Sequence, residues 1–69
     1  MPRFFFNLRT AETHELDIEG MVLGSLHDAV EEANYAAEAA MEMSSGTAGV
    51  FEIEDEGRVV VARVAFNSD

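Results

Sequence analysis

The chain has 69 residues, of which 48% are hydrophobic, and its formal charge is −10 at pH 7. A chain of this length has room for one small domain, residues 1–69, whose stability margin is thin because a small domain buries a smaller share of its surface than a large one. The sequence has no cysteine, which excludes disulfides and thiolate metal sites.

The carboxylates and the arginines are separated along the chain. Thirteen Asp and Glu but no Lys or Arg lie between Thr10 and Gly57, and the four arginines lie near the two ends. This distribution repels nucleic-acid phosphate and anionic lipid, and favours basic or neutral partners. We also expect no membrane span and no export signal, because every apolar run is short and the first one is interrupted at Asn7 and Arg9. The expected location is therefore the cytoplasm.

The sequence begins with two predicted strands. Residues 3–9 alternate, which puts Phe5 on one face and three apolar residues on the other, namely Phe4, Phe6 and Leu8. Alternation over residues 13–19 predicts a second strand, which forms a hairpin with the first and ends at Gly20. We expect the face of Phe4 to lie against the core.

A long helix is predicted to follow this hairpin. Ser25, with Asp28 three residues later, has the spacing of a capping signal, in which side chains satisfy the exposed backbone donors of a helix start. The apolar residues that follow at helical spacing are Leu26, Ala29, Val30, Ala33, Ala37, Ala40 and Met41. Residues 44–46, Ser-Ser-Gly, are expected to end the helix.

Two further strands are predicted at the end of the chain, over residues 50–54 and 58–66, joined through EDEGR. If Glu56 and Gly57 form a two-residue turn with Gly57 at positive φ, one face carries Phe51, Ile53, Val60, Ala62, Val64 and Phe66. A three-residue loop with a bulge would shift the phase of the last strand, and both alternatives stay open.

The order of elements predicts an α+β fold of the ββαββ type, with a four-stranded, antiparallel-rich sheet and one long helix packed on one face. The first and last strands carry apolar residues on both faces, as strands in the middle of a sheet or at a subunit contact do. We therefore expect an apolar patch on the sheet face away from the helix, and such patches mark interaction surfaces. The candidate interface residues are Phe5, Val59, Val61, Arg63 and Ala65.

No residue pattern predicts a catalytic, cofactor or metal site. Arg3, Phe5 and Arg9 could stack and pair with single-stranded bases, but the strong negative charge argues against nucleic acid. His14 and His27 match no zinc spacing, and the carboxylates of DIEG and EDEG lack the spacing of a calcium loop and are typical turn formers. We expect no enzyme, no cofactor and no metal.

Taken together, MPRFFFNLR, DIEG and SLHDAVEEA resemble a family of short alphaproteobacterial proteins with a domain of unknown function, whose members begin with MPR and an aromatic-Phe-aromatic run. That resemblance covers almost the whole chain and implies the hairpin-helix-hairpin fold without any catalytic residue. A looser likeness in fold is to HicB-like antitoxins, in which a hairpin is followed by an Ala-rich acidic helix, and which bind a small basic toxin.

The function expected from the sequence is that of a small protein-interaction domain that self-associates through its sheet as a homodimer. The alternative is an acidic, antitoxin-like or decoy module that binds a small basic protein. The first expectation depends on the first and last strands, which carry apolar residues on both faces. The second depends on the thirteen carboxylates between Thr10 and Gly57.

Overall fold

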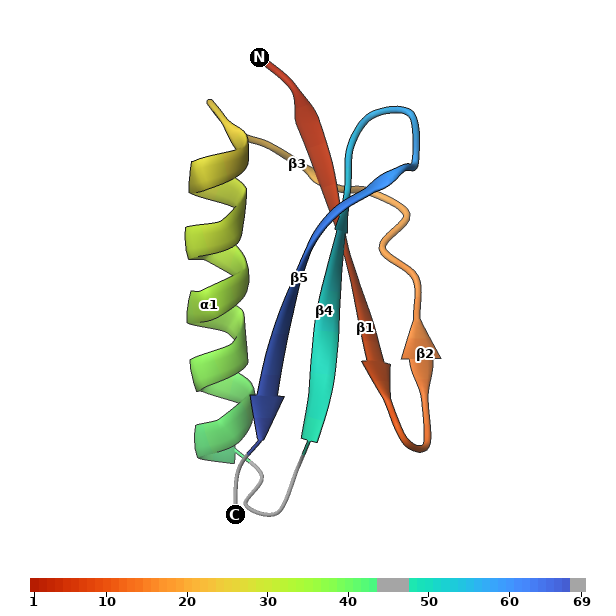
Figure 1. Ribbon diagram of the computed structural model, residues 1–69, viewed down its shortest axis with the longest axis vertical. Helices are drawn as coiled ribbons and strands as arrows, with labels where there is room; N and C mark the ends of the chain where they lie inside the picture. The colour runs from red at the N-terminus through yellow and green to blue at the C-terminus, as the bar shows by residue number, and fades with distance from the viewer. Residues whose placement is uncertain (44–47, 68–69) are drawn as a thin grey trace.

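The computed structural model describes residues 1–43 and 48–67. The described elements, in chain order, are β1 (Arg3–Thr10), β2 (His14–Glu15), β3 (Met21–Val22), α1 (Leu26–Met43), β4 (Ala48–Glu54) and β5 (Val60–Asn67). The predicted helix stop at residues 44–46 lies outside the described residues. Figure 1 shows two layers, with α1 beside a twisted sheet.

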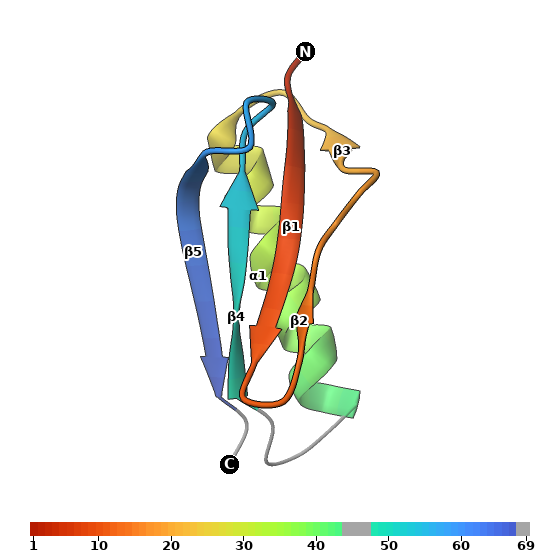
Figure 2. The ribbon, with the colours of Figure 1, turned by 90° about the vertical axis from the view of Figure 1, so that its right-hand side faces the viewer.

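The sheet is antiparallel, in the order β2-β1-β4-β5, and β3 also pairs with β1. The helix covers one face of it, and Figure 2 shows the other face with α1 behind the strands. The predicted α+β class, the antiparallel sheet and the single helix on one face are confirmed. The predicted number of four strands is wrong, because the described residues form five.

The predicted second strand, residues 13–19, is a strand only at His14–Glu15, and the fifth strand, β3, lies beyond the predicted end at Gly20. The main-chain N–H of Asp17 donates to Asn7 Oδ1 at 2.9 Å, and the main-chain N–H of Phe6 donates to Asp17 Oδ2 at 3.0 Å. These side chains replace the backbone ladder between β2 and β3. Gly20, at φ 70°, then returns the chain to β1, so that β2 and β3 lie along the same edge of that strand.

The hairpin between β4 and β5 has the three-residue loop with a bulge, which is the second alternative, and not the two-residue turn. Arg58 N–H donates to the Asp55 carbonyl at 2.9 Å, and Asp55 N–H donates to the Val59 carbonyl at 3.0 Å. The residue at positive φ is Arg58, at 62°, and not Gly57. A bulge follows, in which Val60 pairs with Glu54 while Ala62 pairs with Ile53. The three-residue loop thus places Val60 opposite Glu54, outside the helix-facing set, and the bulge returns Ala62 to the position opposite Ile53.

The helix begins as predicted, since the main-chain N–H of Asp28 donates to Ser25 Oγ at 3.2 Å. The core between helix and sheet is thin, and half of its buried hydrophobic residues are alanines of α1: Phe4, Ala29, Ala33, Ala37, Ile53 and Phe66. Phe6 and Val64 are partly buried and pack against this core. Leu26, predicted on the apolar side of the helix, is instead 41% exposed because it lies in the first turn, beyond the core residues Ala29 and Ala33.

Candidate interaction surface

The sheet face away from α1, called the open face below, carries residues from all three long strands. The register places Phe5 beside Glu54, Asn7 beside Glu52, and Arg9 beside Val50. Across β4, Glu52 pairs with Arg63, and Val50 pairs with Ala65. Because directly paired residues point to the same side of a sheet, these side chains lie on one face, where Asn7 is itself buried and accepts the Asp17 N–H. Figure 2 looks onto this surface.

An ion-pair cluster occupies the middle of the open face. Glu52 Oε2 lies 3.2 Å from Arg63 Nε, and Glu52 Oε1 lies 3.5 Å from Arg9 Nη2. The hydrogen bond from Arg63 lowers the pKa of the Glu52 carboxyl, and the charge of Arg9 lowers it further. Glu52 therefore stays ionised and joins β1 to β5 across β4. The side chains of Arg9 and Arg63 remain more than half exposed, at 53% and 63%.

Arg58 forms a second cluster nearer the hairpin end. Its guanidinium carbon lies 3.9 Å above the centre of the Phe5 ring, a distance at which a cation is attracted by the ring's π-electrons. Its Nε lies 2.9 Å from Glu54 Oε1, and its Nη1 donates to the Asp17 carbonyl at 3.1 Å. Arg58 therefore ties together β1, the segment between β2 and β3, and the β4–β5 hairpin.

The structure separates the five predicted interface residues. Arg63 and Ala65 are exposed on the open face, but Phe5 is half-buried beneath Arg58. Val59 and Val61 are exposed at the start of β5, at 60% and 37%. The expected continuous apolar patch is thus broken by the central ion pairs, and its exposed apolar residues lie in β5 or directly before it: Val59, Val61 and Ala65.

The two edges of the sheet differ in protection. The outer edge of β1 is covered by β2, by the Asn7 and Asp17 side chains, and by β3. In the described part of the chain β5 is paired only with β4, and Figure 2 shows no further strand or helix on its outer side. Alternate backbone N–H and C=O groups of an outermost strand point away from the sheet, available for another strand. We call this side of the molecule the β5 edge.

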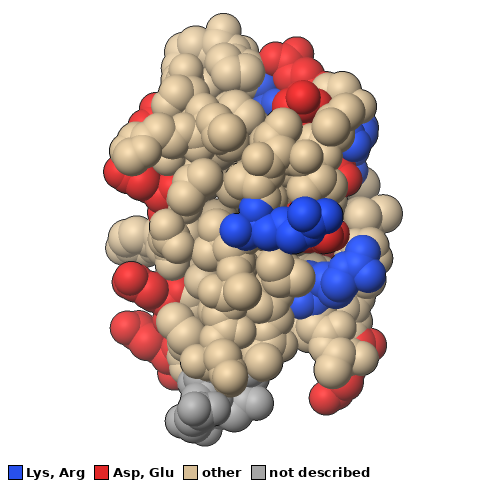
Figure 3. Space-filling model, viewed as in Figure 1, with Lys and Arg blue, Asp and Glu red and all other residues tan. Residues whose placement is uncertain are grey.

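The outer side of α1 has the opposite character from the open face. It carries five carboxylates and no Lys or Arg: Asp28, Glu31, Glu32, Glu38 and Glu42. Figure 3 shows acidic residues along the side where α1 lies and arginines toward the sheet. A shallow hollow of about 120 Å³ on this side is lined by Tyr35, Glu38, Ala39 and Glu42. All four arginines therefore lie in the sheet layer, and the helix layer carries carboxylates without a Lys or Arg.

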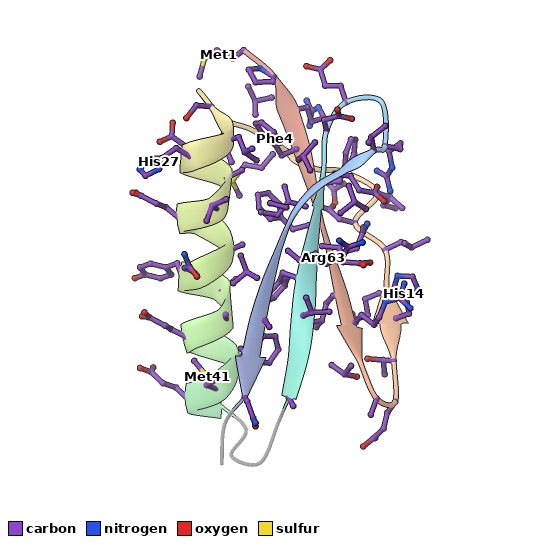
Figure 4. The ribbon with its side chains drawn as sticks, viewed as in Figure 1. Met1, Phe4, His14, His27, Met41 and Arg63 are labelled. Atoms are coloured by element: carbon purple, nitrogen blue, oxygen red, sulfur yellow. The ribbon has the colours of Figure 1, made fainter. Side chains whose placement is uncertain are left out.

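The polar residues weighed as metal ligands have other surroundings. His14 on β2 and His27 on α1 point away from opposite sides of the molecule, as Figure 4 shows, and His27 Nε2 lies 3.3 Å from Glu31 Oε1. Among residues 1–43 and 48–67, no three His, Asp or Glu converge as a metal site would require.

The carboxylates of the two Gly-containing turns act as turn formers, as expected. Asp17 Oδ1 accepts from the main-chain N–H of Gly20 at 2.9 Å, and Asp55 Oδ1 accepts from that of Gly57 at 2.9 Å. Sequence reasoning missed the reach of Asp17 to β1 and the contacts of Arg58. The DIEG turn signals a side chain bound to its own backbone, but nothing in it indicates a bond to Phe6.

Comparison with known proteins gives a family and no closer relative. No curated protein and no solved structure matches the chain significantly. In the part that the structure describes, no helix is long and apolar enough to cross a membrane. A family model matches residues 3–67, which takes in every described element from β1 to β5. The chain therefore belongs to the family DUF6894, a domain of unknown function.

Proposed function

We propose that the protein is a non-enzymatic interaction domain that self-associates through the β5 edge of its sheet. The observation that carries this proposal is the β5 edge, an eight-residue outermost strand that includes the exposed side chains of Val61 and Ala65. An unprotected edge is a template for strand pairing, and proteins that do not use such an edge protect it. The opposite edge of this same sheet is protected.

The thin core supports a second copy as the partner. Among the described residues, three of the six buried hydrophobic residues are alanines, and the largest fully buried side chains are Ile53 and Asn7. A small domain with so little buried volume gains stability from association, because contact with a second copy buries surface that the monomer leaves exposed. Ala62 and Val64 of β5 are only partly buried in the monomer and would be covered further.

Sedimentation of matched variants tests the proposal. Ala65→Lys places a charge at the β5 edge, and Ala39→Lys makes the same change on the exposed side of α1. At about 100 μM, within the range of weak association, we expect the unaltered chain and Ala39→Lys to be dimers and Ala65→Lys to be a monomer. A monomeric unaltered chain at that concentration would refute the proposal, and equal association of both variants would place the contact elsewhere.

A second candidate function rests on the five carboxylates of α1. They form an unbalanced negative surface that suits a small basic protein, which is the role of the acidic modules of HicB-like antitoxins. Salt distinguishes the two candidates. Raising the salt concentration weakens binding of a basic partner but strengthens self-association of a chain with a charge of −10, since it screens attraction in the first case and repulsion in the second. A pull-down with a basic partner that is unaffected by salt would count against the second candidate.

A further inference from the structure

We infer that two copies join through antiparallel pairing of their β5 strands, with the two-fold axis at Val64, to form one continuous sheet. This inference rests on the proposed self-association and specifies its geometry. It commits to a second copy of this chain as the occupant of the β5 edge, and it is argued from two features of the strand and one of the helix.

The first feature is that β5 is suited to strand addition over most of its length. Its eight residues, Val60–Asn67, include neither proline nor glycine. The bulge opposite Ile53 and Glu54 is confined to its start, so that Ala62 to Asn67 continue in regular register with β4. Proteins protect an edge with bulges, prolines and unpaired charges. The only charged side chain of β5 is Arg63, whose charge is compensated by Glu52 3.2 Å away.

The second feature is that the sequence of β5 is complementary to itself in one register. In an antiparallel pair related by a two-fold axis, each residue lies opposite the one at equal distance on the other side of the axis. An axis at Val64 places Val64 opposite its own copy and Ala62 opposite Phe66 on the helix side. On the open face it places Arg63 opposite Ala65, which is small and exposed.

The neighbouring register is disfavoured by charge. An axis at Arg63 would place the two Arg63 side chains directly opposite each other, and like charges in that position are destabilising. An axis at Ala65 would instead shorten the overlap of the two strands, because the described strand ends at Asn67. The axis at Val64 thus keeps the overlap long and the arginines apart.

The third feature is the position of the helix. Because α1 packs against β5 and β4, a two-fold axis perpendicular to the sheet brings the two α1 helices to the same face, on either side of the axis. Both helices are acidic, so they repel each other at low salt. Salt should therefore strengthen this dimer, as the proposed function also requires.

Single cysteines test the register, and the absence of native cysteine makes the test clean. With the axis at Val64, residues 63 and 65 of opposite chains are a direct pair, about 4.5 to 5.5 Å apart between Cα atoms, which a disulfide can bridge. Two copies of residue 63 are then separated by about 8 Å, since they are offset by two residues along the strands. We propose to refold Arg63→Cys and Ala65→Cys chains together, oxidise them, and analyse the products by non-reducing electrophoresis and mass spectrometry.

The expected product is a mixed disulfide between the two variants, with little cross-linking of either variant alone or of an Ala39→Cys control. Efficient cross-linking of Arg63→Cys with itself would overturn the register. A dimer in sedimentation that yields no β5 cross-link at all would overturn the β5 pairing and leave the proposed self-association intact. A chain that sediments as a monomer would overturn both.

Discussion

Arg58 adopts a backbone conformation that is unfavourable for its residue type. Its φ of 62° lies in the left-handed region, which costs a residue with a Cβ atom roughly 1 to 2 kcal/mol. Three side-chain contacts offset this cost: the Phe5 ring, the Glu54 carboxylate and the Asp17 carbonyl. The hairpin is thus held in a strained conformation by the side chain of the strained residue itself.

Two substitutions separate the strain from the contacts. Arg58→Ala removes the contacts and keeps the strained backbone, whereas Arg58→Gly removes the contacts and relieves it. We therefore expect both variants to be less stable than the unaltered chain, with Arg58→Gly about 1 kcal/mol more stable than Arg58→Ala. Urea unfolding followed by circular dichroism measures the difference. Equal stability of the two variants would contradict the positive φ at residue 58.

Asp17 gives the stability a dependence on pH. Partial burial raises the pKa of the Asp17 carboxyl, but three backbone N–H donors, with the charge of Arg58, outweigh it and hold the pKa below its ordinary value. The folded chain therefore binds this proton less readily than the unfolded chain, whose Asp pKa is about 3.9. The stability that this group contributes is complete above that unfolded-state value, and it is lost as pH falls through the lower folded-state pKa.

Asp17→Asn tests this dependence. At pH 7 the variant should lose about 1 to 3 kcal/mol, because the amide cannot accept the Phe6 N–H as the second carboxylate oxygen does. Between about pH 5 and pH 3, its unfolding free energy should fall less steeply than that of the unaltered chain. Glu38→Gln, with the same change of charge on the exposed side of α1, is the control. If Asp17→Asn and Glu38→Gln had the same pH profile, the role of Asp17 would be disproved.

At the scale of elements, the edge of β1 depends on one glycine. Gly20 has a φ of 70°, and a Cβ atom there would lie 2.8 Å from the Phe4 carbonyl oxygen. No side chain fits at that distance without movement of the backbone. Gly20 thus allows the chain to leave the Asp17 turn and pair again with β1 as β3.

Gly20→Ala and Gly57→Ala form a matched pair that tests this role. Gly57 lacks a positive φ, and a Cβ atom there would meet only Asp55 Oδ1, at 3.4 Å. We expect Gly20→Ala to lose about 1 to 3 kcal/mol, through strain at positive φ and the clash with Phe4. Gly57→Ala should change the stability by less than about 1 kcal/mol. Thermal unfolding measures both, and a neutral Gly20→Ala would show that β3 does not need this conformation.

The parts of the fold that depend on neighbouring residues were predictable from the sequence. The alternation of Phe4, Phe6 and Leu8 predicted β1 and its core face, and Ser25 with Asp28 predicted the start of α1. The interruption at Asp17 and the positive φ at Arg58 were not predictable in this way, because each depends on contacts with a distant segment. The same is true of the candidate surface: Phe5 was expected to be uncovered, but Arg58 reaches it from the other end of the chain.

At the scale of the whole molecule, the charges of α1 oppose folding. Asp28 and Glu32, like Glu38 and Glu42, are four residues apart on one helix, and each such like-charged pair costs about 0.2 to 0.5 kcal/mol. The last turn of α1 has no basic residue to interact with the helix dipole. Half of the net charge of −10 therefore lies on α1, where no Lys or Arg compensates it.

Reversal of one charge measures this cost. Glu42→Lys turns a repulsive pair with Glu38 into an attractive one and places a cation near the end of the helix, so it should raise the unfolding free energy by about 0.5 to 1.5 kcal/mol at low salt. Glu12→Lys makes the same change of net charge in the exposed turn after β1 and should gain less. The advantage of Glu42→Lys should shrink in 0.5 M NaCl, where the Debye length is only about 4 Å. An advantage that persists unchanged in salt would rule out an electrostatic cause.

The unequal edges of the sheet also determine how far assembly can proceed. A sheet with two free edges can add strands on both sides without limit, and this is how fibrils grow. Here the other edge is formed by β2, the Asp17 side chain and β3, and β2 and β3 have only two residues each, so β5 is the one long edge strand among the described residues. Addition of a second chain through β5 would use the long edge of both chains and leave only the two-residue strands β2 and β3 at the outside. If the proposed β5 pairing occurs, strand addition should therefore stop at two chains, because short edge strands are poor templates for further pairing.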